Sequence, residues 1–203
     1  MCKIYSYVPT EYFGSNMFLV ESSGEYAVVD PSVSYEELIS DFGGAVRKIK
    51  YVLVTHSHFD HFLAIDSYVN AGAEVIIGKD DAAGLMDSYL NCYSLFCGVD
   101  KGYFGSYRAV DECDTLTLGN ESVRIICTPG HTRGGISYLI ESHLFVGDTV
   151  FADGNYGRCD LPGGNFSLLQ ASIRSILNLS HNITVYCGHG ANTTIEKLKN
   201  YSW

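Results

Sequence analysis

The chain has 203 residues, a formal net charge of -10 at pH 7 and a hydrophobic content of 46%. This length and composition suffice for one large domain over residues 1–203 with a substantial core, and they leave little room for a second domain. The negative charge repels nucleic-acid phosphates and anionic membrane surfaces, so neither nucleic acids nor membranes are expected as partners.

The chain begins with short segments rich in β-branched and aromatic residues. Turn residues separate three of them, which are expected to pair as an antiparallel meander: residues 4–8, 16–21 and 26–29. A helix is expected next, because Ser34 and Glu37 have the spacing of a capping box. The pair Gly43-Gly44 is expected to end that helix.

The most unusual stretch is His-Ser-His-Phe-Asp-His at residues 56–61. It follows an apolar segment, residues 50–55, that predicts a buried strand, and helical spacing of apolar residues continues over residues 59–70. The motif therefore lies on a strand-to-helix turn. Because His56 and His58 can point the same way from an extended chain, the stretch indicates a metal site.

The middle of the chain predicts a strand over residues 74–77 and a helix over residues 82–90. The next stretch, residues 91–110, is rich in aromatic residues and glycines and has no clear period. Such a long loop either contributes to a binding site or buries its own aromatic side chains as an Ω-loop.

The second half of the chain predicts another sheet. Its strands are expected at residues 115–118, 123–127, 136–141 and 143–146. An amphipathic helix with Asn165 as its cap is expected over residues 166–179, followed by a strand over residues 183–186. Thr193 and Glu196 are expected to cap a final short helix.

Four of the predicted strands end in a turn that presents a histidine or an aspartate. These residues are His56, His131, Asp148 and His189. Loops at one edge of packed sheets bring such side chains together. With the rest of the motif at residues 56–61 they supply five histidines and two aspartates, which suffice for two metal ions that share a carboxylate. The remaining histidines, at positions 143 and 181, have no partner motif and are assigned to the surface.

These residues, in this order, resemble the metallo-β-lactamase-fold hydrolases over nearly the whole chain. Within that superfamily, Gly-Arg-Cys-Asp-Leu-Pro-Gly-Gly at residues 157–164 and Gly-His-Gly-Ala-Asn-Thr-Thr-Ile at residues 188–195 are most similar to the glyoxalase II-like group, the hydroxyacylglutathione hydrolases and their short bacterial relatives. The resemblance implies an α/β fold, a four-layer αβ/βα sandwich of two mixed β-sheets flanked by helices, with the metals at one edge.

The resemblance also implies a binuclear centre with two divalent ions, zinc first, with iron or manganese as alternatives. Carried over residue by residue, it places the first metal on His56, His58 and His131, the second on Asp60, His61 and His189, and Asp148 between them. Asp60 and Asp148 are the expected catalytic carboxylates. A hydroxide that bridges the two metals is expected to attack a small acyl-thioester, as in hydroxyacylglutathione hydrolysis.

Arg158 and Tyr156 are the expected substrate-binding residues, because a guanidinium can clamp a carboxylate through two hydrogen bonds. The alternative for Arg158 is a structural ion pair with Asp160 or Asp153. Glyoxalase II enzymes that resemble this chain continue into a helical domain that supplies glutathione contacts, so the thiol of the substrate is left open.

Two alternatives to a thioesterase remain at this stage. Mononuclear iron persulfide dioxygenases resemble the chain in the same motifs, and a non-enzymatic metal-binding domain would keep the same ligands. Flavodiiron proteins carry a carboxylate where His58 stands, and one group of zinc β-lactamases uses a cysteine near the position of Asp148, so both are disfavoured.

The cysteines and the N-terminus bear on location. The seven cysteines are odd in number and form no Cys-x-x-Cys pair, which is typical of a reducing compartment. The first residues lack the apolar core of a signal peptide, and the chain has no run of eighteen apolar residues. A cytoplasmic protein is therefore expected; the oligomeric state is left open.

Overall fold

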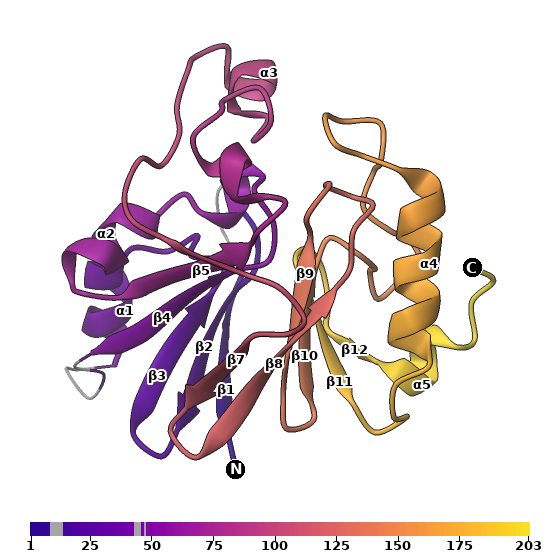
Figure 1. Ribbon diagram of the computed structural model, residues 1–203. Coiled ribbons are helices and arrows are strands. Elements are labelled where there is room, and N and C mark those ends of the chain that lie inside the picture. Colours follow the sequence, from indigo (N-terminus) through magenta and orange to yellow (C-terminus); the bar gives the residue numbers. More distant parts are fainter. Residues whose placement is uncertain (9–13, 43–45, 47) are drawn as a thin grey trace.

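A computed structural model describes residues 1–8, 14–42, 46 and 48–203. In this part of the chain, two six-stranded mixed β-sheets lie face to face, with helices on both outer faces (Figure 1). This is the predicted αβ/βα sandwich. The fold class inferred from the sequence is therefore confirmed.

The first sheet has the order β1-β2-β3-β4-β5-β6. Its strands are β1 (Lys3–Tyr7), β2 (Met17–Ser22), β3 (Glu25–Val29), β4 (Ile49–Val54), β5 (Glu74–Gly78) and β6 (Arg108–Val110). β1, β2 and β3 form the predicted antiparallel meander, whereas β3 to β6 pair in parallel. Parallel pairing sends the carboxyl ends of β3, β4 and β5 to the same edge.

The second sheet has the order β12-β11-β10-β9-β8-β7. Its strands are β7 (Thr115–Leu118), β8 (Glu121–Cys127), β9 (Ile136–Ile140), β10 (His143–Gly147), β11 (Thr184–Cys187) and β12 (Thr193–Thr194). β10 and β11 are parallel and the other neighbours are antiparallel. The predicted second sheet is thus present: the bounds of β7 match the prediction, those of β8 to β11 differ from it by one or two residues, and the short strand β12 was not predicted.

The strands of both sheets alternate between two hydrophobic layers, as the two-residue period of a strand requires. In β4, Tyr51 and Leu53 face the core between the sheets, while Val52 and Val54 face the helices α1 (Tyr35–Asp41) and α2 (Ile65–Asn70). The second sheet alternates in the same way, and its outer face is covered by α4 (Phe166–Leu177) and α5 (Ile195–Leu198). Burial on both faces explains why β4 reads as a continuous apolar run.

The helix caps agree only in part with the prediction. Ser34 and Glu37 form the predicted capping box of α1, and Asn165 caps α4. The cap of α5 is Thr194, whose hydroxyl accepts from the amide of Lys197, so the assignment of Thr193 and Glu196 was wrong. The pair Gly43-Gly44, expected to end α1, lies outside the described residues.

The helix predicted over residues 59–70 is interrupted. The structure has a 3₁₀ turn, η1 (Phe59–His61), and then the short helix α2. In a continuous helix the amide of Ala64 would bond to the carbonyl of Asp60. Instead that amide donates to Pro31, and the Asp60 carbonyl accepts from the amide and hydroxyl of Ser15. Contacts with distant segments therefore replace the helical hydrogen bond.

The helix predicted over residues 82–90 is shorter for the same reason. Only a 3₁₀ turn, η2 (Ala82–Leu85), is present. The carbonyl of Leu85 accepts from the amide of Tyr103, and the amide of Tyr89 donates to the Asp87 side chain. Tertiary contacts and a local side-chain acceptor thus end the helix after one turn.

Residues 91–110, expected to lack regular structure, contain the short helix α3 (Tyr93–Cys97) and strand β6. Figure 1 shows α3 above the upper edge of the first sheet. Tyr103 is buried and its hydroxyl donates to the carbonyl of Ser106, whereas Phe104 is 77% exposed. The segment therefore buries some of its own aromatics and leaves others at the surface. No helix in the described part of the chain is long and apolar enough to cross a membrane.

Candidate metal centre

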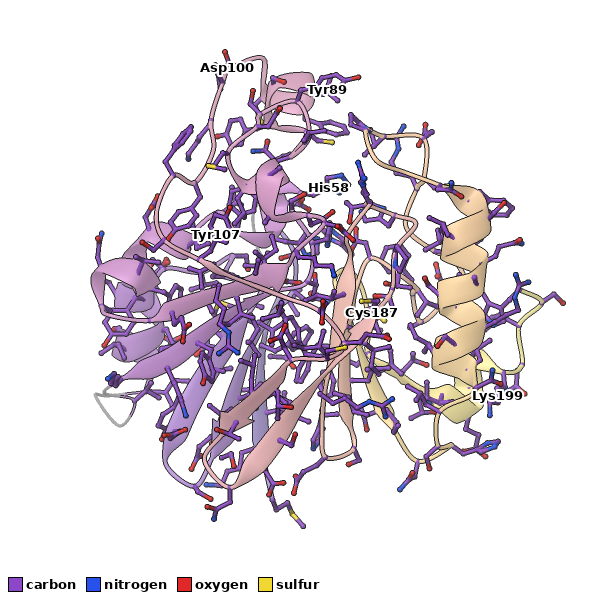
Figure 2. All side chains as sticks on the ribbon, viewed as in Figure 1. His58, Tyr89, Asp100, Tyr107, Cys187 and Lys199 are labelled. Atoms are coloured by element: carbon purple, nitrogen blue, oxygen red, sulfur yellow. The ribbon has the colours of Figure 1, made fainter. Side chains whose placement is uncertain are left out.

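The predicted ligands follow four strands that end at one edge of the sandwich. His56 lies just beyond β4, His131 follows β8, Asp148 directly follows β10 and His189 follows β11. His58 lies at this edge, between the segments that belong to the two sheets (Figure 2). The two packed sheets thus bring the predicted side chains together.

The seven side chains form three overlapping groups whose candidate ligand atoms lie within 4.8 Å of one another. The groups are His56, His58 and His131; His56, His61 and Asp148; and Asp60, His61 and His189. The first and third groups match the two ligand sets implied by the sequence resemblance. The shared members bring both sets into one continuous cluster.

Asp148 lies between the two ligand sets. Its Oδ1 is 3.5 Å from Nε2 of His61, and its Oδ2 is 3.7 Å from Nε2 of His131 and 3.5 Å from Nε2 of His189. One carboxylate therefore faces imidazoles of both sets, which is the position that a bridging ligand requires.

Several polar atoms of this cluster are buried without a hydrogen-bond partner. They are Nε2 of His56, His58, His61 and His131, and Oδ1 of Asp148. A buried polar atom without a partner costs about 1–3 kcal/mol, so such a concentration requires an explanation. Imidazole nitrogens and carboxylate oxygens are donors suited to zinc, iron and manganese. The cluster thus fits the metal ions that the sequence implies.

The cluster has two electrostatic environments. Burial and, to a smaller extent, the neighbouring His131 lower the pKa of His58 to about 3. Burial also lowers the pKa of His61, but Asp60, Asp30 and Asp148 outweigh it and raise that pKa well above the usual range. His58 is thus neutral, the form in which an imidazole binds a metal ion. His61 binds a proton at the position that a metal ion would otherwise occupy.

Asp30, at the end of β3, is a site residue that the sequence analysis missed. Its Oδ2 lies 2.9 Å from Nδ1 of His61 and accepts from the hydroxyl of Thr55 at 2.7 Å, and its Oδ1 accepts from the Thr55 amide. The Thr55 oxygen in turn lies 3.1 Å from Nδ1 of His56. Because these contacts hold the Nδ1 side of both rings, they leave Nε2 free for a metal. The signal, a carboxylate after an apolar strand, was in the sequence.

Asp81 is a second residue that the sequence analysis missed. Its carboxylate accepts from the amide of Ser57, the hydroxyl of Thr132 and the amide of Gly134. These bonds tie the loop that carries His58 to the loop that carries His131. No local pattern identifies Asp81, because its partners come from distant segments.

Ser15 and Asn16 hold the far side of the centre. The Asn16 amide group donates to the carbonyls of Cys187 and Gly190, on either side of His189, and Ser15 donates to the carbonyl of Asp60. The two residues that precede β2 thus position two members of one ligand set. This role has no signature in the local sequence.

Close backbone approach requires glycine at two positions of the site. A methyl group on Gly188 would overlap Oδ1 of Asp148 and lie 2.7 Å from Cε1 of His61. At Gly157 it would overlap the carbonyl of Asp148 and lie 2.7 Å from Nδ1 of His131. Glycine is therefore needed at these positions for space and not only for backbone freedom.

A cavity of about 300 Å³ opens over the cluster. Its lining residues are His58, Phe59, Asp60, Cys92, Phe96, His131, Asp148, Phe151, Gly157, Arg158 and Leu161. Cys92 and Phe96 belong to the segment around α3, so residues 91–110 supply part of one wall. A volume of this size lies at the lower end of the range of roughly 300–1,000 Å³ for small-molecule sites.

The two predicted substrate residues differ in position. Arg158 lines the cavity, and its guanidinium makes two hydrogen bonds with Asp160, the ion pair considered as the alternative in the sequence analysis. Tyr156 is not among the lining residues; it is 42% exposed and its ring packs against Phe166. Arg158 therefore lines the cavity, whereas the Tyr156 ring does not.

The two histidines assigned to the surface have separate surroundings. His181 is exposed, with Nε2 3.2 Å from Nζ of Lys199. His143 is only half-buried and lies 2.9 Å from the hydroxyl of Tyr186. Neither belongs to the candidate metal groups of the described residues.

A family model described as the metallo-beta-lactamase superfamily matches residues 11–189. The chain belongs to this superfamily. The relatives of this metallo-β-lactamase-fold protein include a hydroxyacylglutathione hydrolase, GloC, of Haemophilus influenzae, which is 30% identical over 95% of the chain and 93% of the relative. A probable polyketide biosynthesis zinc-dependent hydrolase, PksB, of Bacillus subtilis is 30% identical over 90% of the chain and 76% of the relative.

Solved structures of the superfamily have the same fold. BLEG-1, a B3 metallo-β-lactamase, superposes with a TM-score of 0.88 at 30% identity and covers 98% of this chain and 97% of its own. TTHA1623, in a di-iron-bound form, superposes with a TM-score of 0.82 at 26% identity and covers 97% of this chain and 96% of its own. Relatives of this fold therefore include proteins named for zinc and for iron.

Proposed function

We propose that this protein is a binuclear metal-dependent hydrolase of small acyl-thioesters, similar to the hydroxyacylglutathione hydrolases. One observation carries the proposal: seven histidine and aspartate side chains converge at one edge, and five of their buried polar atoms have no partner in the protein. The similarity to GloC supports the thioester as substrate.

The first metal would be held by His56, His58 and His131, and the second by Asp60, His61 and His189, with Asp148 shared. Within each of these two sets of three, the candidate ligand atoms lie within 4.8 Å of one another, which supports both assignments. When bound, two such cations polarise a carbonyl group and lower the pKa of a water molecule toward neutrality, which supplies the nucleophile. Zinc is the first expectation, and iron is the alternative that the di-iron form of TTHA1623 supports.

The chain's own residues orient these ligands and shape the substrate site. Asp30 fixes the ring of His61 through Nδ1, and the carbonyl of Arg158 lies 2.6 Å from Nδ1 of His131. The cavity above them has room for a small acyl group and is lined by Asp60 and Asp148, so the carbonyl of such a group would lie near these carboxylates. The two carboxylates are the proposed catalytic residues, because they would hold both the ions and the nucleophile in place.

The cavity also favours a thioester over an ordinary ester. A thiol has a pKa of about 8.5 and leaves as a thiolate, whereas an alkoxide needs a proton at departure. Among the described lining residues, His58 and His131 are proposed metal ligands, so their imidazoles cannot also donate a proton to the leaving group. Burial raises the pKa of Cys92 to about 11, which makes its thiol a weak proton donor. A leaving group that needs no general acid therefore suits this site best.

Metal analysis and a thioester assay test the proposal together. We expect purified, metal-replete protein to hold about two metal ions per chain and to release thiol from a small acyl-thioester. Asp148→Asn should lower turnover by at least about a hundredfold, since the shared carboxylate is lost, while the control variant His181→Ala should retain turnover. Protein that binds two metals but cleaves no thioester would contradict the proposal, and one iron per chain with oxygen consumption would favour a persulfide dioxygenase.

The cysteines support a cytoplasmic location as part of this proposal. All seven are free thiols, and Cys97, Cys113 and Cys127 are exposed. Exposed free thiols persist in a reducing compartment. Fractionation of cells that produce the protein tests this, and recovery from an oxidising compartment would contradict it.

A further inference from the structure

We propose that the cavity selects acyl groups that are apolar and uncharged, and that Asp160 enforces this selection by neutralising Arg158. This inference rests on the proposed thioester hydrolysis and specifies its substrate class. It follows from the composition of the cavity wall and from the hydrogen bonds of one arginine.

The cavity wall above the histidine and aspartate cluster is mainly apolar. Phe59, Phe96, Phe151 and Leu161 face the cavity around the histidine and aspartate side chains. Phe59 is 4% exposed, and its ring lies 4.9 Å from the ring of Tyr93 and 6.4 Å from that of Phe96. This packing holds the aromatic wall in place. An apolar acyl group that binds against the wall is removed from contact with water, which favours its binding.

Arg158 is the only cationic side chain among the described residues that line the cavity. Its Nε and Nη2 donate to Oδ1 and Oδ2 of Asp160, each at 2.7 Å. This is the two-point geometry with which an arginine would otherwise bind a substrate carboxylate. The Nε and Nη2 donors on this side of the guanidinium are therefore occupied within the chain, and the Asp160 carboxylate offsets its charge, while three of the five N–H groups make no hydrogen bond to Asp160.

An anionic acyl group gains little from this arrangement. To bind the two donors that Asp160 holds, it must displace that carboxylate, so one charge-assisted pair replaces another and a free carboxylate remains beside it. At the remaining N–H groups it meets a guanidinium whose charge Asp160 already offsets. The formal net charge of -10, which two bound divalent ions would change to -6 (-10 + 4), also repels an approaching anion. An uncharged apolar acyl group meets neither obstacle.

The test compares two thioesters of one neutral thiol, a butanoyl ester and a succinyl ester. They differ mainly in a methyl group against a carboxylate at the end of the chain. For the wild-type protein we expect kcat/KM to favour the butanoyl ester by about tenfold or more. In Asp160→Asn, the freed guanidinium should raise the succinyl-to-butanoyl ratio of kcat/KM by about threefold to fivefold, the upper range for one exposed ion pair.

Three further variants distinguish the charge of Asp160 from a structural role. Asp160→Glu keeps a carboxylate and should keep the wild-type ratio. The double variant Arg158→Ala/Asp160→Asn should lose the gain, because no guanidinium remains. Arg133→Ala removes an exposed arginine that lines a neighbouring cavity, and it should leave the ratio as in the wild-type protein. A wild-type preference for the succinyl ester, or an unchanged ratio in Asp160→Asn, would overturn the inference.

A binding measurement separates this inference from the proposed function. Ketone analogues in which a methylene group replaces the thioester sulfur cannot be hydrolysed, and calorimetry gives their affinities for the metal-replete protein. If no thioester is cleaved, the proposed function fails, and the analogues still report the cavity. Tighter binding of the butanoyl analogue, with a shift toward the succinyl analogue in Asp160→Asn, supports the selection; equal affinities with no shift contradict it.

Discussion

Replacing Asp30 by asparagine tests whether the carboxylate behind His61 prepares the metal centre. Asp30 is 1% exposed and has two partners, Thr55 and His61. Asparagine keeps the size of the side chain and one oxygen, which can still accept from the Thr55 amide. Its NH₂ group then faces the Thr55 hydroxyl and Nδ1 of His61, where an acceptor was.

The expected loss can be worked from these contacts. Each hydrogen bond to a charged group contributes about 1.5–3 kcal/mol. The Thr55 hydroxyl can rotate and accept from the new amide, so the main cost falls on His61, and we expect the metal-free protein to lose about 3 kcal/mol of unfolding free energy. His61 avoids two facing donors by losing the proton on Nδ1 and keeping the one on Nε2, the atom that faces Asp60 and Asp148. That tautomer cannot bind a metal, so affinity at this ligand set should fall about 10–100-fold.

Two measurements check this expectation. Urea unfolding of chelator-treated protein gives the stability of the metal-free state, and metal content after dialysis against buffered zinc gives the affinity. Asp66→Asn is the matched control, because Asp66 is exposed on α2 and its replacement should change stability by less than about 0.5 kcal/mol. If Asp30→Asn binds two zinc ions with wild-type affinity, the proposed orienting role is wrong.

Three further outcomes are expected. Gly188→Ala should displace Asp148 and lower the metal content to about one ion per chain or less, measured by mass spectrometry of the metals, because the added methyl overlaps the carboxylate. Asn16→Ala removes two hydrogen bonds around His189 and should lower stability by about 1–3 kcal/mol in urea unfolding. As pH falls, the ligand set with His61 and His189 should release its metal first: their pKa values are raised by the neighbouring carboxylates despite burial, so protons compete there at a higher pH than at His56 and His58, whose pKa values burial lowers. A metal titration at several pH values checks this order, and simultaneous release would contradict it.

Much of the fold follows from local sequence patterns. The apolar run of β4 and the capping box of Ser34 and Glu37 depend on neighbours in the chain, and both are present in the structure. The helices predicted over residues 59–70 and 82–90 were broken by partners that local periodicity does not contain, namely Pro31 for the first and Tyr103 for the second. Prediction thus failed where a distant backbone group took the place of the helical hydrogen bond.

The chemical character of the candidate site can be predicted from the sequence alone, because the histidines and aspartates stand at the ends of recognisable strands. What holds these side chains in place depends on the tertiary structure. Asp30 and His61 are 31 residues apart, and Asn16 and Cys187 are 171 apart. In the tertiary structure Arg158 lines the cavity and donates a hydrogen bond to Asp160. The Tyr156 ring packs against Phe166 and does not line the cavity. The physical reason is that side-chain types and local periods are written along the chain, whereas orienting hydrogen bonds and cavity walls arise only when remote segments pack together.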